Sequence, residues 1–202
     1  LSEHVARDAE GTMRHSRGWH EVMDRIQFGG LPVVSAMFGA VIGGGLELAS
    51  ATHARVADPS AFFQLPEGRR GIFVGGGGSV NITRLMGVAR MTDLMLTGRV
   101  LSAEEAERIA VVTYLAEPGK ALDKAMELAG RIAENAPLSN YTTINALQRV
   151  HDSGYDEGLF FESMMATLTQ TTPEAIERLQ AFIEKRAKPL DIPAEQQKSE
   201  TT

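Results

Sequence analysis

Two glutamates, each beside a glycine-rich turn, are the residues of this chain best suited to chemistry. Glu47 follows the run Gly43-Gly44-Gly45, and Glu67 lies twenty positions later, ahead of a second glycine cluster at 71–78. A pair of carboxyl groups can supply one general acid and one general base when the fold brings them together. Their spacing in the sequence does not by itself show that they meet.

The triple glycine is expected to join a strand to a helix. An apolar, partly β-branched run at 31–37 predicts a buried strand before it, and Leu46, Leu48 and Ala49 are good helix formers after it. Glycines admit positive φ and leave room for a close approach to the backbone. Since the first helical amides also carry the positive end of the helix dipole, the Gly44 amide is a candidate donor to an oxygen that develops negative charge.

Each of these features also has an ordinary explanation. A triple glycine can be a flexible turn, Glu47 can simply favour the helix dipole, and Glu67 can be a solvated loop acid. Trp19, on the apolar face of a helix expected at 12–26, is expected to be core. Neither glycine cluster continues as a phosphate-binding loop or a dinucleotide-binding motif. The five histidines show no ligand spacing, so no metal site is expected.

Composition excludes several classes of function. The 202 residues carry a formal net charge of −6, which argues against nucleic acid or an anionic membrane as the main partner. Cysteine is absent, which rules out disulfides, thiolate nucleophiles and Cys-ligated zinc. No apolar run approaches the roughly 20 residues of a membrane-spanning helix, and no signal peptide is visible. A cytoplasmic location is the default expectation.

The pattern of elements changes along the chain. Up to 136, short strands alternate with helices, and beyond Pro137 only helices are expected. The expected strands lie at 54–57, 61–63 and 111–115, and the expected helices at 81–86, 88–96, 120–135, 138–150, 159–168 and 173–187. Ser102 and Glu105 form a capping-box pattern. We divide the chain into a core (1–136), a C-terminal helical region (137–188) and a mobile tail (189–202).

Several motifs in a fixed order resemble the crotonase (enoyl-CoA hydratase/isomerase) superfamily. They lie at 32–47, 61–67, 71–78, 84–87 and 96–106, with a weaker match at 182–186. The resemblance implies an α/β fold, a crotonase-like spiral of ββα units with a C-terminal helical oligomerisation region. It also implies a segment ahead of Leu1 that holds the first strands and a second oxyanion-hole amide, so this chain is expected to lack its N-terminal part.

The resemblance implies roles for five residues. Gly44 would supply one oxyanion-hole amide, Glu47 would activate the attacking water, and Glu67 would deliver a proton. Phe182 and Lys185 match positions that contact coenzyme A, often from a neighbouring subunit. For these two residues, a packed phenylalanine and an exposed lysine on an amphipathic helix remain an equal alternative.

The implied function is that of an enoyl-CoA hydratase, a lyase that adds water across the 2,3 double bond of an acyl-CoA thioester. An enoyl-CoA isomerase or a C–C hydrolase/lyase of the same fold is the first alternative, and a non-catalytic acyl-CoA-binding or scaffold protein is the second. Coenzyme A would enter as part of the substrate, with no tightly bound cofactor. A homotrimer or homohexamer is expected. Phe38, Arg70, Phe73 and Val74 depart from the family pattern or add bulk near the glycine loops, which leaves the acyl chain open.

Overall fold

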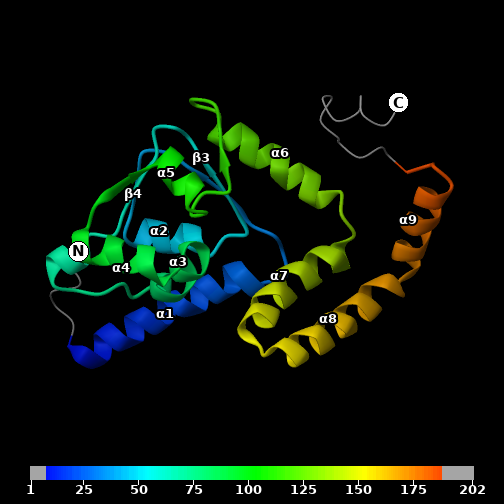
Figure 1. Ribbon diagram of the computed structural model, residues 1–202, viewed down its shortest axis with the longest axis horizontal. Helices are drawn as coiled ribbons and strands as arrows, with labels where there is room; N and C mark the ends of the chain where they lie inside the picture. The colour runs from blue at the N-terminus through cyan, green and yellow to red at the C-terminus, as the bar shows by residue number, and fades with distance from the viewer. Residues whose placement is uncertain (1–7, 188–202) are drawn as a thin grey trace.

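The computed structural model describes residues 8–187, which begin with helix α1 (Ala9–Phe28). The Asp8 carboxylate accepts a hydrogen bond from the Gly11 amide at 2.7 Å and so caps the first turn. This confirms the helix predicted at 12–26 and extends it at both ends. Figure 1 shows α1 running along one side of the fold, beneath the helices that carry the glycine turns.

Two three-stranded sheets form the α/β core. The first contains parallel strands in the order β1 (Val34–Met37), β3 (Ala54–Ala57) and β6 (Tyr114–Leu115). The second has the order β2 (Ala40–Ile42), β4 (Phe62–Gln64) and β5 (Val100–Ser102), with β2 and β4 parallel and β4 and β5 antiparallel. Because β1 and β2, and then β3 and β4, are consecutive strands in different sheets, the chain advances as the expected spiral of ββα turns.

The helices that follow these strands are short and surround an apolar core. They are α2 (Gly44–Ser50), the 3₁₀ turn η1 (Gly68–Arg70), α3 (Gly78–Met86), α4 (Val88–Thr97), α5 (Ala103–Arg108) and α6 (Ala121–Ala133). Leu46, Phe63, Leu65, Ile82 and Leu94 are completely or almost completely buried in this core. Burial of such side chains stabilises the fold by about 25 cal/mol per Å² of apolar surface, and it fixes α2 and α3 against the second sheet.

Two strand predictions were wrong in their boundaries. The run at 31–37 was expected to lead directly into the triple glycine, but β1 ends at Met37 and the separate strand β2 precedes the glycines. Gly39, at φ +61°, turns the chain between them. At 111–113, Val111 and Val112 are buried but both amides bond to the Ala106 carbonyl, so they close the turn after α5. β-Branching there indicates burial and not strand pairing.

Two helix-boundary signals are confirmed. Gly87 separates α3 from α4, as its place in the sequence predicted. Ser102 caps α5, where its hydroxyl accepts from the Glu105 amide at 3.2 Å. The Glu105 carboxylate bonds to Arg99 at 2.6 Å and does not complete the reciprocal half of a capping box.

The last three described helices are α7 (Pro137–Asp152), α8 (Tyr155–Gln170) and α9 (Pro173–Ile183). They confirm a helical region without strands at 137–187, and Thr172 caps α9 by accepting from the Ala175 amide at 3.1 Å. Figure 1 shows α7 against α1, with α8 and α9 extending away from the sheets. The tail predicted at 189–202 lies outside the described residues, and the domain division stays a prediction. Within residues 8–187, no helix combines the length and apolar character needed to cross a membrane.

His53 ties the end of α1 to the start of β1. Its Nδ1 accepts from the Val33 amide at 2.9 Å, and its Nε2 lies 3.0 Å from the Gln27 carbonyl oxygen. Because Nδ1 accepts, Nε2 must carry the proton and donate to the carbonyl. The neutral imidazole thereby satisfies one donor and one acceptor of the backbone.

We therefore expect His53→Ala to lower the free energy of unfolding by about 1–3 kcal/mol, because it leaves two partly buried backbone groups without their partner. Denaturant unfolding measures this difference. His151→Ala, at an exposed position of α7, is the matched control and should stay within about 0.5 kcal/mol of the parent. Equal effects of the two substitutions would show that the two hydrogen bonds of His53 contribute no stability.

Candidate active site

The triple glycine starts α2 at the end of the second sheet. Gly43 has φ +53°, and its amide donates to the Gln64 carbonyl of β4 at 2.9 Å. Its carbonyl accepts from the Glu47 amide at 2.9 Å, which closes the first helical turn. The Gly44 and Gly45 amides lie in this first turn, where no intrahelical acceptor exists. The turn is therefore held by backbone bonds and leaves the Gly44 and Gly45 amides without an intrahelical acceptor.

The Glu47 carboxylate is buried and bound by the second glycine cluster. Its side chain is only 6% exposed, and Oε1 accepts from the Gly76 amide at 2.7 Å and from the Gly78 amide at 3.0 Å. A Cβ atom at Gly78 would lie 2.8 Å from Glu47 Cγ, so this position has room only for glycine. Two amide donors suit an ionised carboxylate, which can only accept.

The Glu67 carboxyl is also buried, but only one of its two oxygens is satisfied. It is 9% exposed, and among the residues that the structure describes its Oε2 is the one fully buried side-chain polar atom that has no hydrogen bond. Burial raises the pKa of Glu67, and the negative charge of Glu47 raises it further, whereas a hydrogen bond from its own backbone amide and the charge of Arg70 oppose the shift. A raised pKa favours the protonated carboxyl, which is the form that can donate a proton.

The structure brings the two acids to the same turn. A Cβ at Gly43 would lie 2.5 Å from Glu67 Oε1, so the Glu67 carboxyl touches the residue that caps the helix carrying Glu47. The electrostatic effect of Glu47 on Glu67 is consistent with this proximity. The first turn of α2 thus combines free amides, a carboxylate held by amides, and a carboxyl with a raised pKa.

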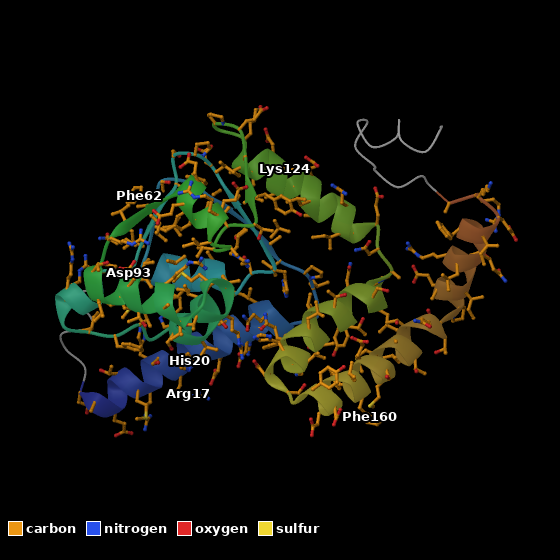
Figure 2. The ribbon with its side chains drawn as sticks, in the orientation of Figure 1. Arg17, His20, Phe62, Asp93, Lys124 and Phe160 are labelled. Atoms are coloured by element: carbon orange, nitrogen blue, oxygen red, sulfur yellow. The ribbon has the colours of Figure 1, made fainter. Side chains whose placement is uncertain are left out.

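Helix α1 contributes contacts that the sequence did not indicate. The Ser16 hydroxyl donates to the Gly75 carbonyl at 2.6 Å and so ties the second glycine cluster to α1. Trp19 was expected to be core, but it is only half-buried, and its ring lies 3.8 Å from where a Gly44 Cβ would be. His20 also lies on the side of α1 that faces α3, as Figure 2 shows. No motif marks these residues, since only the fold brings α1 to the glycine turns.

Phe182 and Lys185 do not join this group within one chain. Phe182 is 65% exposed on α9, and Lys185 follows the helix with φ +57°. Among the described helices and strands, α9 has its main contacts with α8, and Figure 1 places it far from α2. The contact of these two residues with coenzyme A stays a prediction.

An apolar groove runs along a different face of α2. Its volume is about 430 Å³, and its wall includes β1 together with Gly45, Leu48 and Thr52. These positions repeat at helical spacing, whereas Glu47 points to another side. The two acids therefore lie beside this groove and not in its wall. Within residues 8–187, no cluster of three or more His, Asp or Glu side chains is placed to hold a metal ion.

The raised pKa of Glu67 predicts a pH-dependent stability. In the unfolded chain this carboxyl titrates near its ordinary value of 4.5, and in the folded chain above it. The folded state then binds more protons between the two values, so its free energy of unfolding falls as the pH rises through that window. Glu67→Gln removes the titration, and we expect its stability relative to the parent to increase as the pH rises above the ordinary value of 4.5.

Denaturant unfolding at a series of pH values measures this difference. Glu162→Gln, at an exposed position of α8, is the control and should show no such increase. A flat difference for Glu67→Gln would mean that burial does not shift this carboxyl.

Comparisons with known proteins agree with this architecture. The family model for enoyl-CoA hydratase/isomerase matches residues 2–191. A short-chain-enoyl-CoA hydratase from Clostridium acetobutylicum is 34% identical over 167 residues, which are 83% of this chain and 64% of that protein. The solved structure of an enoyl-CoA hydratase from Bacillus anthracis is 31% identical with a TM-score of 0.85, covering 92% of this chain and 72% of its own.

A solved structure from Rhodopseudomonas palustris CGA009 is more similar in sequence, with 53% identity and a TM-score of 0.86 over 89% of this chain and 70% of its own. The chain spans only 64% of the Clostridium protein and 60% of a Bacillus subtilis relative. The match to the family model and these relatives show that the chain has the crotonase fold and belongs to the enoyl-CoA hydratase/isomerase family.

Proposed function

We propose that this protein is a hydro-lyase that adds water across the 2,3 double bond of an acyl-CoA thioester. The observation that supports this most is the pair of buried acids at the start of α2. Glu47 is bound by two amides, whereas Glu67 has a raised pKa and a buried oxygen without a partner. A hydratase needs one carboxylate and one carboxylic acid in this relation, because it must take a proton from water and give one to carbon.

The first step is polarisation of the thioester. The Gly44 amide would donate to the thioester carbonyl oxygen, which gains negative charge as the conjugated system becomes enolate-like. One such donor is worth roughly 3–4 kcal/mol in the transition state. The Gly44 amide suits this task because it lies in the first turn of α2 and needs no intrahelical acceptor.

The addition then divides between the two acids. Glu47 would accept a proton from a bound water as the water oxygen bonds to the β-carbon, and Glu67 would deliver its proton to the α-carbon. Water is thereby added as OH on one carbon and H on the other, and proton exchange with solvent restores both groups. The Gly76 and Gly78 amides occupy Oε1 of Glu47, which leaves Oε2 for the water.

We also propose a homotrimer or a homohexamer. Helices α8 and α9 expose large apolar side chains that the chain itself does not cover: Leu159, Phe160, Met164, Leu168, Leu179, Phe182 and Ile183. Figure 2 shows Phe160, 70% exposed, on the side of α8 that faces away from the sheets. Exposed apolar surface of this extent is typical of subunit interfaces. In such an assembly, Phe182 and Lys185 could approach the coenzyme A of a neighbouring subunit.

We expect the full-length protein to hydrate crotonyl-CoA, seen as loss of the absorbance of the conjugated thioester. Glu47→Gln and Glu67→Gln should each lower kcat by about 100-fold or more, because each removes a proton-transfer group. Glu162→Gln is the matched control and should keep the parental rate.

Other outcomes identify the alternatives. Conversion of a 3-enoyl-CoA without hydration would indicate an isomerase, and binding of acyl-CoA in calorimetry without turnover would indicate a binding protein. An unchanged rate in Glu67→Gln would contradict the assignment of the acid.

The glycine that packs on Glu47 gives a second test. A Cβ at Gly78 would lie 2.8 Å from Glu47 Cγ and must displace that side chain. We expect Gly78→Ala to lower kcat by as much as about 100-fold, since displacement by about 1 Å can cost that much. At Gly75 a Cβ would meet only the Ser16 hydroxyl, at an ordinary 3.7 Å, so Gly75→Ala should stay active. Circular dichroism checks that both variants fold, and equal rates would argue against a role of Glu47.

A further inference from the structure

A cavity of about 230 Å³ lies between α2, α3 and α7, apart from the two glutamates. We call it the Arg55 cavity; the polar side chains in its wall, beside apolar ones, include Gln27, His53, Arg55, Asn81, Arg84 and Gln148. Its wall contains two arginines and no aspartate or glutamate, although the whole chain has a formal net charge of −6. Arg84 forms an ion pair with Asp152 of α7. Arg55 is therefore the arginine of this wall whose charge has no carboxylate partner among the described residues.

Arg55 is buried without a carboxylate partner. It is 7% exposed, its Nε donates to the Val111 carbonyl at 2.8 Å, and its Nη1 donates to the Thr52 carbonyl at 2.6 Å. These bonds use two of the five N–H donors of a guanidinium. In the part of the chain that the structure describes, no ion pair or further hydrogen bond engages the guanidinium of Arg55.

The Nη2 atom of Arg55 carries two of the unused donors. Among residues 8–187, Glu67 Oε2 is the one fully buried polar side-chain atom that has no hydrogen-bond partner. The Nη2 atom of Arg55 is therefore not fully buried, and the space that Arg55 lines is this cavity. Burial lowers the pKa of Arg55, yet a guanidinium stays charged in proteins. A desolvated charge of this kind is stabilised when an anion pairs with it.

We propose that the Arg55 cavity binds a small oxyanion, a carboxylate or a phosphate, whose oxygen atoms accept from the free donors of Arg55. The planar guanidinium matches both groups with two parallel hydrogen bonds. The cavity is smaller than the 300–1,000 Å³ or so of sites for drug-sized ligands, which excludes a nucleotide or an acyl-CoA. The amide side chain of Gln148, which lines the same cavity, can donate to the same anion.

The site lies directly behind the helix that carries Glu47. Ser50 lines the cavity, and its hydroxyl donates to the Glu47 carbonyl at 2.6 Å. The Thr52 carbonyl that binds Arg55 follows the last turn of α2, and the Thr52 hydroxyl donates back to the Ala49 carbonyl at 2.7 Å. An anion that fixes Arg55 therefore stabilises the turn from α2 to β3.

The test titrates inorganic phosphate and acetate separately into the full-length protein, with ionic strength held constant by sodium chloride. We expect the midpoint of thermal unfolding to rise in a saturable way, and calorimetry to give the dissociation constant. A response to phosphate alone identifies a phosphate site, and a response to acetate identifies a carboxylate site. No rise with either anion would overturn the proposal and leave water as the occupant.

Three variants locate the binding. Gln148→Glu adds a negative charge to the wall of the Arg55 cavity and should weaken anion binding about tenfold or more. Gln180→Glu makes the same change at an exposed position of α9 and should leave binding unchanged. Arg55→Met should abolish the response, and if it does not fold, the Gln148→Glu result decides. Equal binding by Gln148→Glu and the parent would place the anion elsewhere and overturn the proposal.

Discussion

The structure depends on the two hydrogen bonds that Glu47 Oε1 accepts from the Gly76 and Gly78 amides. They join residues about thirty positions apart and hold α2 against the start of α3. A carboxylate that is 6% exposed would be costly without such donors. The glycines are required in turn, because a Cβ at Gly78 would collide with Glu47. The buried carboxylate therefore needs the amides of the glycine cluster, and the cluster needs glycine at position 78 to make room for the carboxylate.

The contrast between the two glutamates follows from these partners. One carboxylate oxygen of Glu47 accepts hydrogen bonds from backbone amides, whereas Glu67 Oε2 is buried and has no hydrogen-bond donor. Each additional negative charge nearby makes ionisation of Glu67 less favourable, and Glu47 supplies that charge. Two residues of the same type therefore have different surroundings: Glu47 is held by two backbone amides, and burial raises the pKa of Glu67. This difference is what acid–base chemistry on one substrate requires.

The sequence predicted the parts of this structure that rest on local signals. Helices with regular apolar spacing, the Gly87 break and the Thr172 cap depend on neighbouring residues and were found. Strand β2 was missed because a strand of three residues is too short to show an alternating pattern. Residues 111–113 were wrongly predicted as strand because β-branched side chains are favoured both in buried turns and in paired strands. The contacts of Ser16 and Trp19 could not be predicted from the sequence, since they arise only when α1 packs beside the glycine turns. The two glutamates were singled out from their glycines, but their proximity needed the fold.

The C-terminal helices differ in how much they bury. Helix α7 packs on α1, buries Thr142, Ile144 and Ala146, and forms one wall of the Arg55 cavity. Helix α8 buries only Gly158, and α9 buries no residue, although both carry large apolar side chains. Apolar surface left in water is unfavourable at about 25 cal/mol per Å², so the exposed apolar side chains of α8 and α9 add little to the stability of the chain on its own. Helix α7 contacts both α1 and α8, and so links the core that holds the acids to the last two described helices, although it leaves Tyr141 and Leu147 exposed.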